Sequence, residues 1–313
     1  MPRTFARQLD DDLWLLDLNF QGTPGVIAAF LLTADGGHTL IETGPGSTLP
    51  ALERAISAAG ARLDDVRQLV VTHIHLDHAG AAGTLLRRLP DARLLVHPAG
   101  AAHMIDPSKL IASATRIYGD AMDRLWGAFE PCPADRVITL ADESEIRCGT
   151  RTLRVLHTPG HASHHIAYAD LERRTAFTGD VAGVRLGATS YVRPPTPPPD
   201  IDIEAWHASA HRLRALGLRG LDLTHFGRIP DAANHLDTLV RNLDDGVAWL
   251  AERLRRGEDP STIADELARR GEMDVIRTGG SASDAAAYEL ATPSRMSVDG
   301  VARYLKRRGG RDA

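Results

Sequence analysis

Short apolar runs bounded by turn residues open the chain. Residues 13–16, 25–32 and 38–41 are predicted to be strands, with Gly36-Gly37 as the turn between the last two. Apolar residues at helical spacing follow from about 49 to 59. The pattern then alternates, with a strand at 66–72, a helix at 79–89 and a strand at 92–97. A β-meander followed by this alternation predicts an α/β fold.

The middle and the end of the chain are predicted to be increasingly helical. Between 103 and 129, apolar residues lie mostly three or four positions apart, which predicts an amphipathic insertion. It can belong to the core, wall a hydrophobic pocket, or form the seam of a homodimer. Further strands are predicted at 137–140, 152–156, 166–169, 175–178 and 221–224, and helices at 203–216, 231–256, 261–270 and 298–307. We predict a main domain over 1–235 and a helical extension, packed on it, over 236–313.

The composition is that of an ordinary folded protein. Of 313 residues, 43% are hydrophobic and 25% are charged. The net charge of -5 gives no reason to expect nucleic acid or a membrane surface as a partner. Cys132 and Cys148 are too few for a disulfide scaffold, and no run of about 18 apolar residues occurs. We therefore expect a cytoplasmic protein that acts on a small molecule.

Four side chains that can bind metal occur in the six residues His73-Ile74-His75-Leu76-Asp77-His78. Alternate residues of an extended chain share a side, so His73 and His75 can approach one ion together. Asp77 and His78 fall on the following turn and can face a second position. The alternative is that these polar residues only begin an exposed helix, which Asp77 or His78 caps.

Three further metal-competent residues each follow a predicted strand: His161, Asp180 and His225. Open α/β sheets commonly place ligand sites at the carboxyl ends of their strands, so one edge is predicted to collect these side chains. The proline-rich run 193–200 would normally mark a linker between domains. Because Asp180 and His225 lie on either side of it and must converge, we predict a stiff loop within one domain.

The ordered set His73-x-His75-x-Asp77-His78, His161, Asp180 and His225 resembles the metal motif of the metallo-β-lactamase superfamily, over about residues 10–235. The resemblance implies a four-layer αββα sandwich with the site on one edge of the paired sheets. It also implies two metal ions, with His73, His75 and His161 on the first, Asp77, His78 and His225 on the second, and Asp180 bridging both.

Two adjacent divalent ions can acidify a bridging water and polarise a carbonyl group, which predicts a hydrolase for a small ester, lactone or thioester. Asp77 is the candidate to orient the nucleophile or to move a proton. Zinc is favoured, with iron and manganese as alternatives. A different class stays open: a mononuclear non-heme iron oxygenase resembling persulfide dioxygenases, using His73, His161 and Asp180. A metal-binding protein without turnover is the third interpretation.

Residues around the ligands complete the predicted site. Many members of the superfamily carry Asp-x-Gly where this chain has Glu42-Thr43-Gly44, and the resemblance places Glu42 to accept a ring N–H from a metal-bound histidine. Tyr191 and Arg193 follow Asp180 closely enough to be candidates for contact with substrate. His164 and His165, which lie close to His161 in the sequence, are expected to shape the site.

Overall fold

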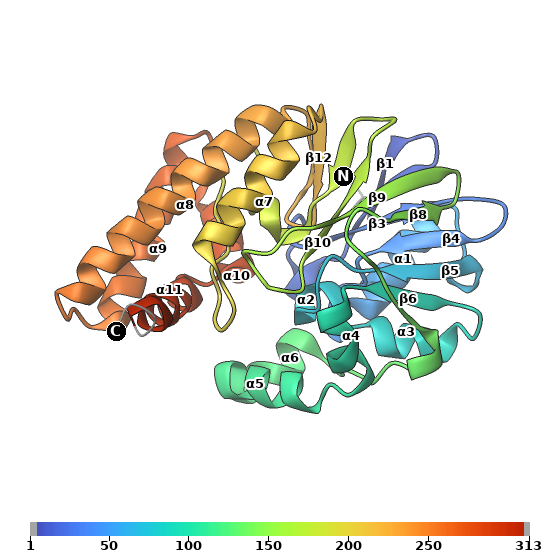
Figure 1. The fold of residues 1–313 in the computed structure, drawn as a ribbon, viewed down its shortest axis with the longest axis horizontal. Coiled ribbons are helices and arrows are strands. Elements are labelled where there is room, and N and C mark those ends of the chain that lie inside the picture. The colour runs from blue at the N-terminus through green and yellow to red at the C-terminus, as the bar shows by residue number, and fades with distance from the viewer. Residues whose placement is uncertain (1–4, 310–313) are drawn as a thin grey trace.

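Two stacked β-sheets form the centre of the molecule in the computed structural model, which describes residues 5–309 (Figure 1). The first sheet follows chain order: β1 (Ala6–Asp10), β2 (Leu13–Asp17), β3 (Ala28–Leu32), β4 (His38–Ile41), β5 (Val66–Val70), β6 (Arg93–Val96) and β7 (Val137–Thr139). The second has the spatial order β13 (Gly227–Ile229), β12 (Gly220–Leu223), β11 (Thr175–Phe177), β10 (Ile166–Asp170), β9 (Arg151–His157) and β8 (Glu145–Cys148). Strands β4 to β7 pair in parallel, as do β11 and β12; the other neighbours are antiparallel.

Helices lie on both outer faces of the paired sheets (Figure 1). On the side of the first sheet are α1 (Leu49–Ala58), α2 (Leu76–Ala79), α3 (Ala82–Arg88), α4 (Pro98–Ile105), α5 (Ser108–Tyr118) and α6 (Met122–Trp126). On the side of the second are α7 (Ile203–Ala215), α8 (Ala232–Arg255), α9 (Pro260–Arg277) and α11 (Ser294–Gly309), and α10 (Ala282–Ala291) packs against α9. The predicted αββα sandwich with a helical insertion and a helical C-terminal region is confirmed.

Strand β3 shows why the central strands are apolar throughout. Phe30 and Leu32 face the second sheet, whereas Leu31 faces the helices on the other side. Both faces of the strand are buried, so side chains of either parity must be hydrophobic. The helices after residue 235 are held in a similar way, because Leu236 and Ile263 share one apolar cluster with Leu221 of β12.

Several elements differ from the sequence prediction. Strands β1, β8 and β13 were not predicted from the sequence. The edge strand β1 contains mostly polar residues, and β8 and β13 are short, so none of the three has a long apolar run. Helix α10 was missed, although Ser281 and Asp284 form a capping box at its start. The insertion divides into α4, α5 and α6, and the predicted helix at 79–89 begins instead with α2, directly after His75.

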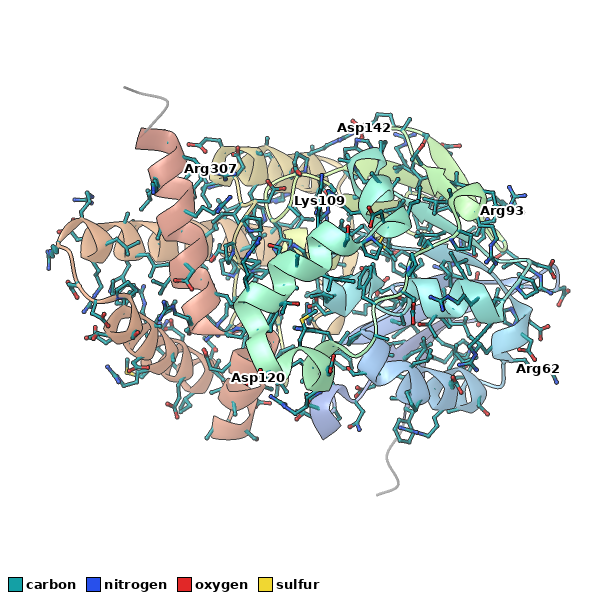
Figure 2. The ribbon with its side chains drawn as sticks, turned by 90° about the horizontal axis from the view of Figure 1, so that it is seen from below. Arg62, Arg93, Lys109, Asp120, Asp142 and Arg307 are labelled. Carbon is teal, nitrogen blue, oxygen red and sulfur yellow. The ribbon has the colours of Figure 1, made fainter. Side chains whose placement is uncertain are left out.

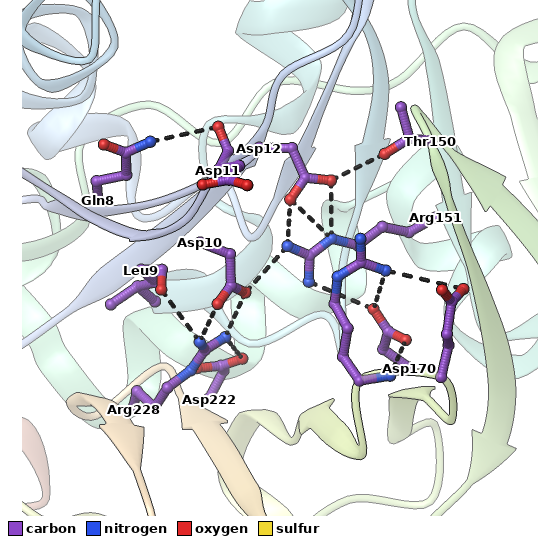
Figure 3. Close-up of polar contacts among 12 residues, drawn as sticks. Gln8, Leu9, Asp10, Asp11, Asp12, Thr150, Arg151, Asp170, Asp222 and Arg228 are labelled. Atoms are coloured by element: carbon purple, nitrogen blue, oxygen red, sulfur yellow. Dashed lines mark hydrogen bonds and ion pairs between the residues drawn. The ribbon is translucent and has the colours of Figure 1, made fainter.

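An ion-pair network ties the first strands of one sheet to the other sheet (Figure 3). Its members are the guanidinium groups of Arg151 and Arg228 and the carboxylates of Asp10, Asp12, Asp170 and Asp222. The Arg151 side chain is fully buried and donates to Asp10, Asp12 and Asp170. We call these six residues the arginine network.

Residues 1–4 and 310–313, the outer ends of the two proposed domains, lie outside the described residues. Among the helices of residues 5–309, none combines the length and apolarity needed to cross a membrane.

Candidate metal centre

The predicted ligands follow strand ends that meet at one edge of the paired sheets. His73 follows β5, His161 follows β9 and His225 follows β12, while Asp180 lies in a 3₁₀ turn, Gly179–Ala182, after β11. At this edge the two sheets are joined by backbone hydrogen bonds, from Ile166 N to Thr72 O at 2.7 Å and from Ala28 N to Thr224 O at 2.8 Å. The residues just before His73 and His225 are therefore fixed relative to each other.

Three imidazoles converge on one point. His75 Nδ1 lies 2.9 Å from His73 Nε2 and 2.9 Å from His161 Nε2. His73 and His161 are buried, and His75 is partly exposed. The three nitrogens all lie within 4.8 Å of one another, which is close enough for them to hold a single ion.

Asp180 connects this group to a second one. Its Oδ2 lies 3.3 Å from His161 Nε2, whereas its Oδ1 lies 3.3 Å from His78 Nε2 and 3.5 Å from His225 Nε2. Asp77 Oδ2 completes the second group at 3.4 Å from His225 Nε2. The structure thus brings all seven predicted ligands together, with one Asp180 oxygen directed at each group.

Hydrogen bonds on the far side of three rings fix which nitrogen faces the centre. The Nδ1 atoms of His161 and His225 lie 2.9 Å from Pro195 O and 2.7 Å from Val26 O, and His78 Nδ1 lies 3.0 Å from Glu42 Oε1. Carbonyl and carboxylate oxygens only accept, so each Nδ1 donates. The Nε2 atom of each ring is therefore the one that faces the centre, and it presents a lone pair there when the ring is neutral.

A cation fits this arrangement. His78 Nε2, His225 Nε2 and Asp180 Oδ1 are buried without a hydrogen-bond partner. Lone pairs that face carboxylate oxygens are stabilised only by a proton or a metal ion between them. Tetrahedral zinc with Zn–N near 2.0–2.1 Å separates its ligand atoms by about 3.3 Å. The separations of 3.3 to 3.5 Å around Asp180 are close to that value.

Glu42 organises the second group from behind. Its fully buried Oε1 accepts from Thr72 Oγ1 at 2.5 Å and from Thr224 Oγ1 at 3.2 Å, besides His78 Nδ1. Thr72 Oγ1 gives its proton to Glu42, so it accepts from His73 Nδ1 at 3.0 Å. The longer glutamate side chain therefore reaches a histidine of the cluster, as expected.

Sequence reasoning missed Thr72 and Thr224. Each directly precedes a predicted ligand histidine, and this repeated Thr-His pair was the available signal. His165, expected only to shape the site, is fully buried, and its Nε2 accepts the backbone N–H of Asp180 at 3.2 Å. It holds Asp180 in position through the backbone of that residue.

The charges of the cluster shift the pKa values of its members in opposite directions. Burial alone would lower the pKa of His78, but the carboxylates of Asp180, Asp77 and Glu42 raise it well above the ordinary value. Burial would raise the pKa of Asp180, but the surrounding histidines hold it well below the ordinary value. The pKa of His73, which burial and its histidine neighbours both lower, falls well below the usual range. The centre therefore favours anionic carboxylates that attract positive charge.

Tyr191 and Arg193 lie apart from this cluster. The buried guanidinium of Arg193 pairs with Glu289 at 2.7 Å, and Tyr191 packs against Tyr288. Both line a small cavity beside α8 and α9, and neither lines the larger cavity that opens onto the predicted ligands. Their contact with substrate stays a prediction that this arrangement does not favour.

A family model described as the metallo-beta-lactamase superfamily matches residues 22–219, and the chain belongs to that superfamily. A metallo-beta-lactamase fold-containing protein of Sulfurisphaera tokodaii is 31% identical over 170 residues, which are 53% of this chain and 63% of the relative. The chain thus spans less than two thirds of that relative's length.

Two longer matches extend over the helical C-terminal region. An atrochrysone carboxyl ACP thioesterase of Aspergillus fumigatus is 24% identical over 289 residues, 92% of this chain and 73% of the relative. The crystal structure of a metallo-beta-lactamase family protein from Thermus thermophilus superposes with a TM-score of 0.68 at 20% identity, covering 96% of this chain and 95% of the other. At that identity, the likeness concerns the fold.

Proposed function

We propose that this protein is a dinuclear metal-dependent hydrolase that cleaves a small ester, lactone or thioester. The observation that carries the proposal is the orientation of Asp180, which directs Oδ2 at His161 and Oδ1 at His78 and His225. A carboxylate with one oxygen toward each of two nitrogen groups is suited to bridge two ions. The thioesterase name of the Aspergillus relative supports an acyl bond as the target.

The chain's own residues have separable roles in this proposal. When bound, two divalent ions would supply Lewis acidity toward a carbonyl oxygen and an acidified water, and zinc suits the imidazole and carboxylate ligands. His73, His75 and His161 would hold one ion, and Asp77, His78 and His225 the other, with Asp180 between them.

Asp77 is the proposed catalytic carboxylate. Its side chain is 16% exposed and lines the cavity, while the Asp180 side chain is 5% exposed. A carboxylate at the cavity wall can orient an attacking water or accept its proton, and can then protonate the leaving group. Glu42, in contrast, is shielded from the cavity and positions His78.

The test uses protein stripped of metal by a chelator and reloaded separately with zinc, manganese or iron. The panel contains a p-nitrophenyl ester, a lactone, a thioester, a phosphodiester and a β-lactam. We expect ester, lactone or thioester hydrolysis to return with metal under anaerobic conditions, with two ions per chain. One iron per chain with oxygen consumption in the presence of a persulfide would instead establish the oxygenase.

A further inference from the structure

A cavity of about 550 Å³ opens directly onto the candidate metal centre. His75, Asp77, His161 and Asp180 line it. This volume lies within the range of about 300–1,000 Å³ that is usual for pockets that enclose a small molecule. A substrate whose reacting bond lies at the predicted ligands therefore has room to extend away from them.

The walls of this cavity come from the insertion and the C-terminal helices. Helices α5 and α6 contribute Leu110, Ala114, Leu125 and Trp126, and the α10–α11 region contributes Leu290 and Met296. Tyr118 of α5 approaches Met296 of α11, with its Oη 3.3 Å from Sδ. Figure 2 shows α5, with Lys109 near its start, running beside α11 on this side of the molecule. Two segments far apart in the sequence thus enclose one apolar space.

Besides the predicted ligands and Tyr118, the ionisable side chains of these walls are those of His103, Lys109, His164, Asp200 and Glu289. Glu289 pairs with Arg193, and Asp200 accepts the backbone N–H of Ser163 at 2.9 Å. Among the lining residues, Lys109 is the only lysine or arginine, and it is solvent-exposed. Beyond the predicted ligands, the cavity matches an apolar group, whose transfer from water is favourable.

We propose that this cavity binds the apolar acyl group of the substrate, so that the protein prefers medium-length acyl chains to acetyl groups. The inference rests on the proposed function, since the acyl carbonyl must lie at the metal centre for the chain to enter the cavity. It assigns the insertion and α10–α11 to substrate selection. Each methylene buried in the cavity is expected to raise kcat/KM about fourfold until the cavity is filled.

The chain length of p-nitrophenyl esters, from acetate to decanoate, is the first variable of the test. We expect kcat/KM of the wild type to rise by about two orders of magnitude between butyrate and octanoate. Ala114→Phe places a ring in the cavity from α5, and we expect it to remove most of this rise, measured as the ratio of kcat/KM for octanoate to kcat/KM for acetate. Ala112→Phe, on the exposed side of the same helix and outside the cavity, is the matched control.

A second variant tests the opposite wall and covers the case in which Ala114→Phe does not fold. Ala291→Phe fills the cavity from the end of α10, and Ala286→Phe, exposed on that helix and outside the cavity, is its control. Binding of the neutral probe 1-decanol to metal-free protein, measured by calorimetry, adds a readout that needs no catalysis. We expect both cavity variants to weaken it at least tenfold and both controls to leave it unchanged.

The outcomes separate this inference from the proposed function. Acetate hydrolysis with a flat chain-length profile, unchanged in the cavity variants, would overturn the acyl pocket and leave the hydrolase standing. 1-Decanol binding that the cavity variants abolish, with no ester, lactone or thioester cleaved under any metal, would support an apolar pocket and overturn the hydrolase.

Discussion

The metal centre and the arginine network are two clusters of charge, buried in large part, that differ in which groups neutralise their carboxylates. In the network, Asp10 and Asp222 accept from Arg228 at 2.8 Å each, and the Asp170 carboxylate accepts from Arg151 at 3.3 Å (Figure 3). Among buried side-chain atoms of residues 5–309 that have no hydrogen-bond partner, none belongs to the network. The chain supplies its own cations there.

At the metal centre, no lysine or arginine is paired with the carboxylates of Asp77, Asp180 or Glu42 among the described ion pairs. They face imidazole nitrogens, and two of those nitrogens and one Asp180 oxygen have no hydrogen-bond partner. Buried aspartates are therefore structural where a guanidinium group balances them. Buried aspartates are candidate metal ligands where the neutralising positive charge must come from outside the chain.

The largest effect is expected for Asp180→Ala, which removes the oxygens shared by both groups. Lewis-acid stabilisation is worth several kcal/mol, so kcat/KM for the best ester should fall by about a thousandfold or more, together with loss of bound metal. The control is Asp64→Ala, at an exposed site. A variant that still holds two ions and hydrolyses at the wild-type rate would remove the proposed role of Asp180.

Arg151→Met should damage the other cluster and spare the centre. It leaves Asp170, whose side chain is 1% exposed, with only the partly exposed Arg173 as an ion-pair partner at 3.5 Å, so we expect the free energy of unfolding to fall by about 3 kcal/mol. Denaturant titration measures this loss, and Arg62→Met at an exposed pair should cost no more than about 1 kcal/mol. Metal content per folded chain should be unchanged, and a loss of metal here would mean that the two clusters are not independent.

Glu42→Gln should weaken metal binding without unfolding the chain. The neutral amide is a poorer acceptor for His78 Nδ1–H, and such supporting contacts commonly contribute 10–100-fold in metal affinity. Competition with a chromophoric chelator measures the change. Glu53→Gln, in an exposed pair with Arg88, is the matched control. Equal affinities in wild type and Glu42→Gln would leave Glu42 with no role in metal binding.

The smallest effect concerns acid stability of the network. The hydrogen bond from Arg151 is the main cause that lowers the pKa of Asp12 from 3.8 to about 2. Because the folded pKa lies below the unfolded one, the contribution of Asp12 is present above about pH 4 and is lost as the pH falls toward 2. In thermal melts, Asp12→Asn should therefore lose less stability than the wild type over that interval. Identical slopes would contradict the assignment.

Much of the fold and of the centre could be predicted because the signals are local. A strand buried on both faces, such as β3, must be apolar. A ligand at the end of such a strand follows the apolar run in the sequence and can be recognised there. Glu42 could be placed only by resemblance, because its carboxylate reaches His78 across 36 residues. Thr224 likewise contacts Glu42 across 182 residues, a separation over which no sequence pattern predicts contact.

Proximity in sequence to Asp180 did not place Tyr191 and Arg193 beside the cluster, and their contact with substrate stays a prediction. After Asp180 the chain reverses, and Val184 pairs with Arg193 in an isolated antiparallel bridge. This reversal directs Arg193 toward Glu289 near the end of α10. The walls of the large cavity could not be assigned either, because α5 meets α11 only through tertiary packing.

The most direct measurement is the number of metal ions per chain after metal-free protein is loaded with zinc and the excess is removed. Elemental mass spectrometry should give two ions for the wild type and for Arg151→Met, and a clear loss for Asp180→Ala. A wild-type ratio of one, or a ratio of two that survives Asp180→Ala, would contradict a centre in which Asp180 bridges two ions.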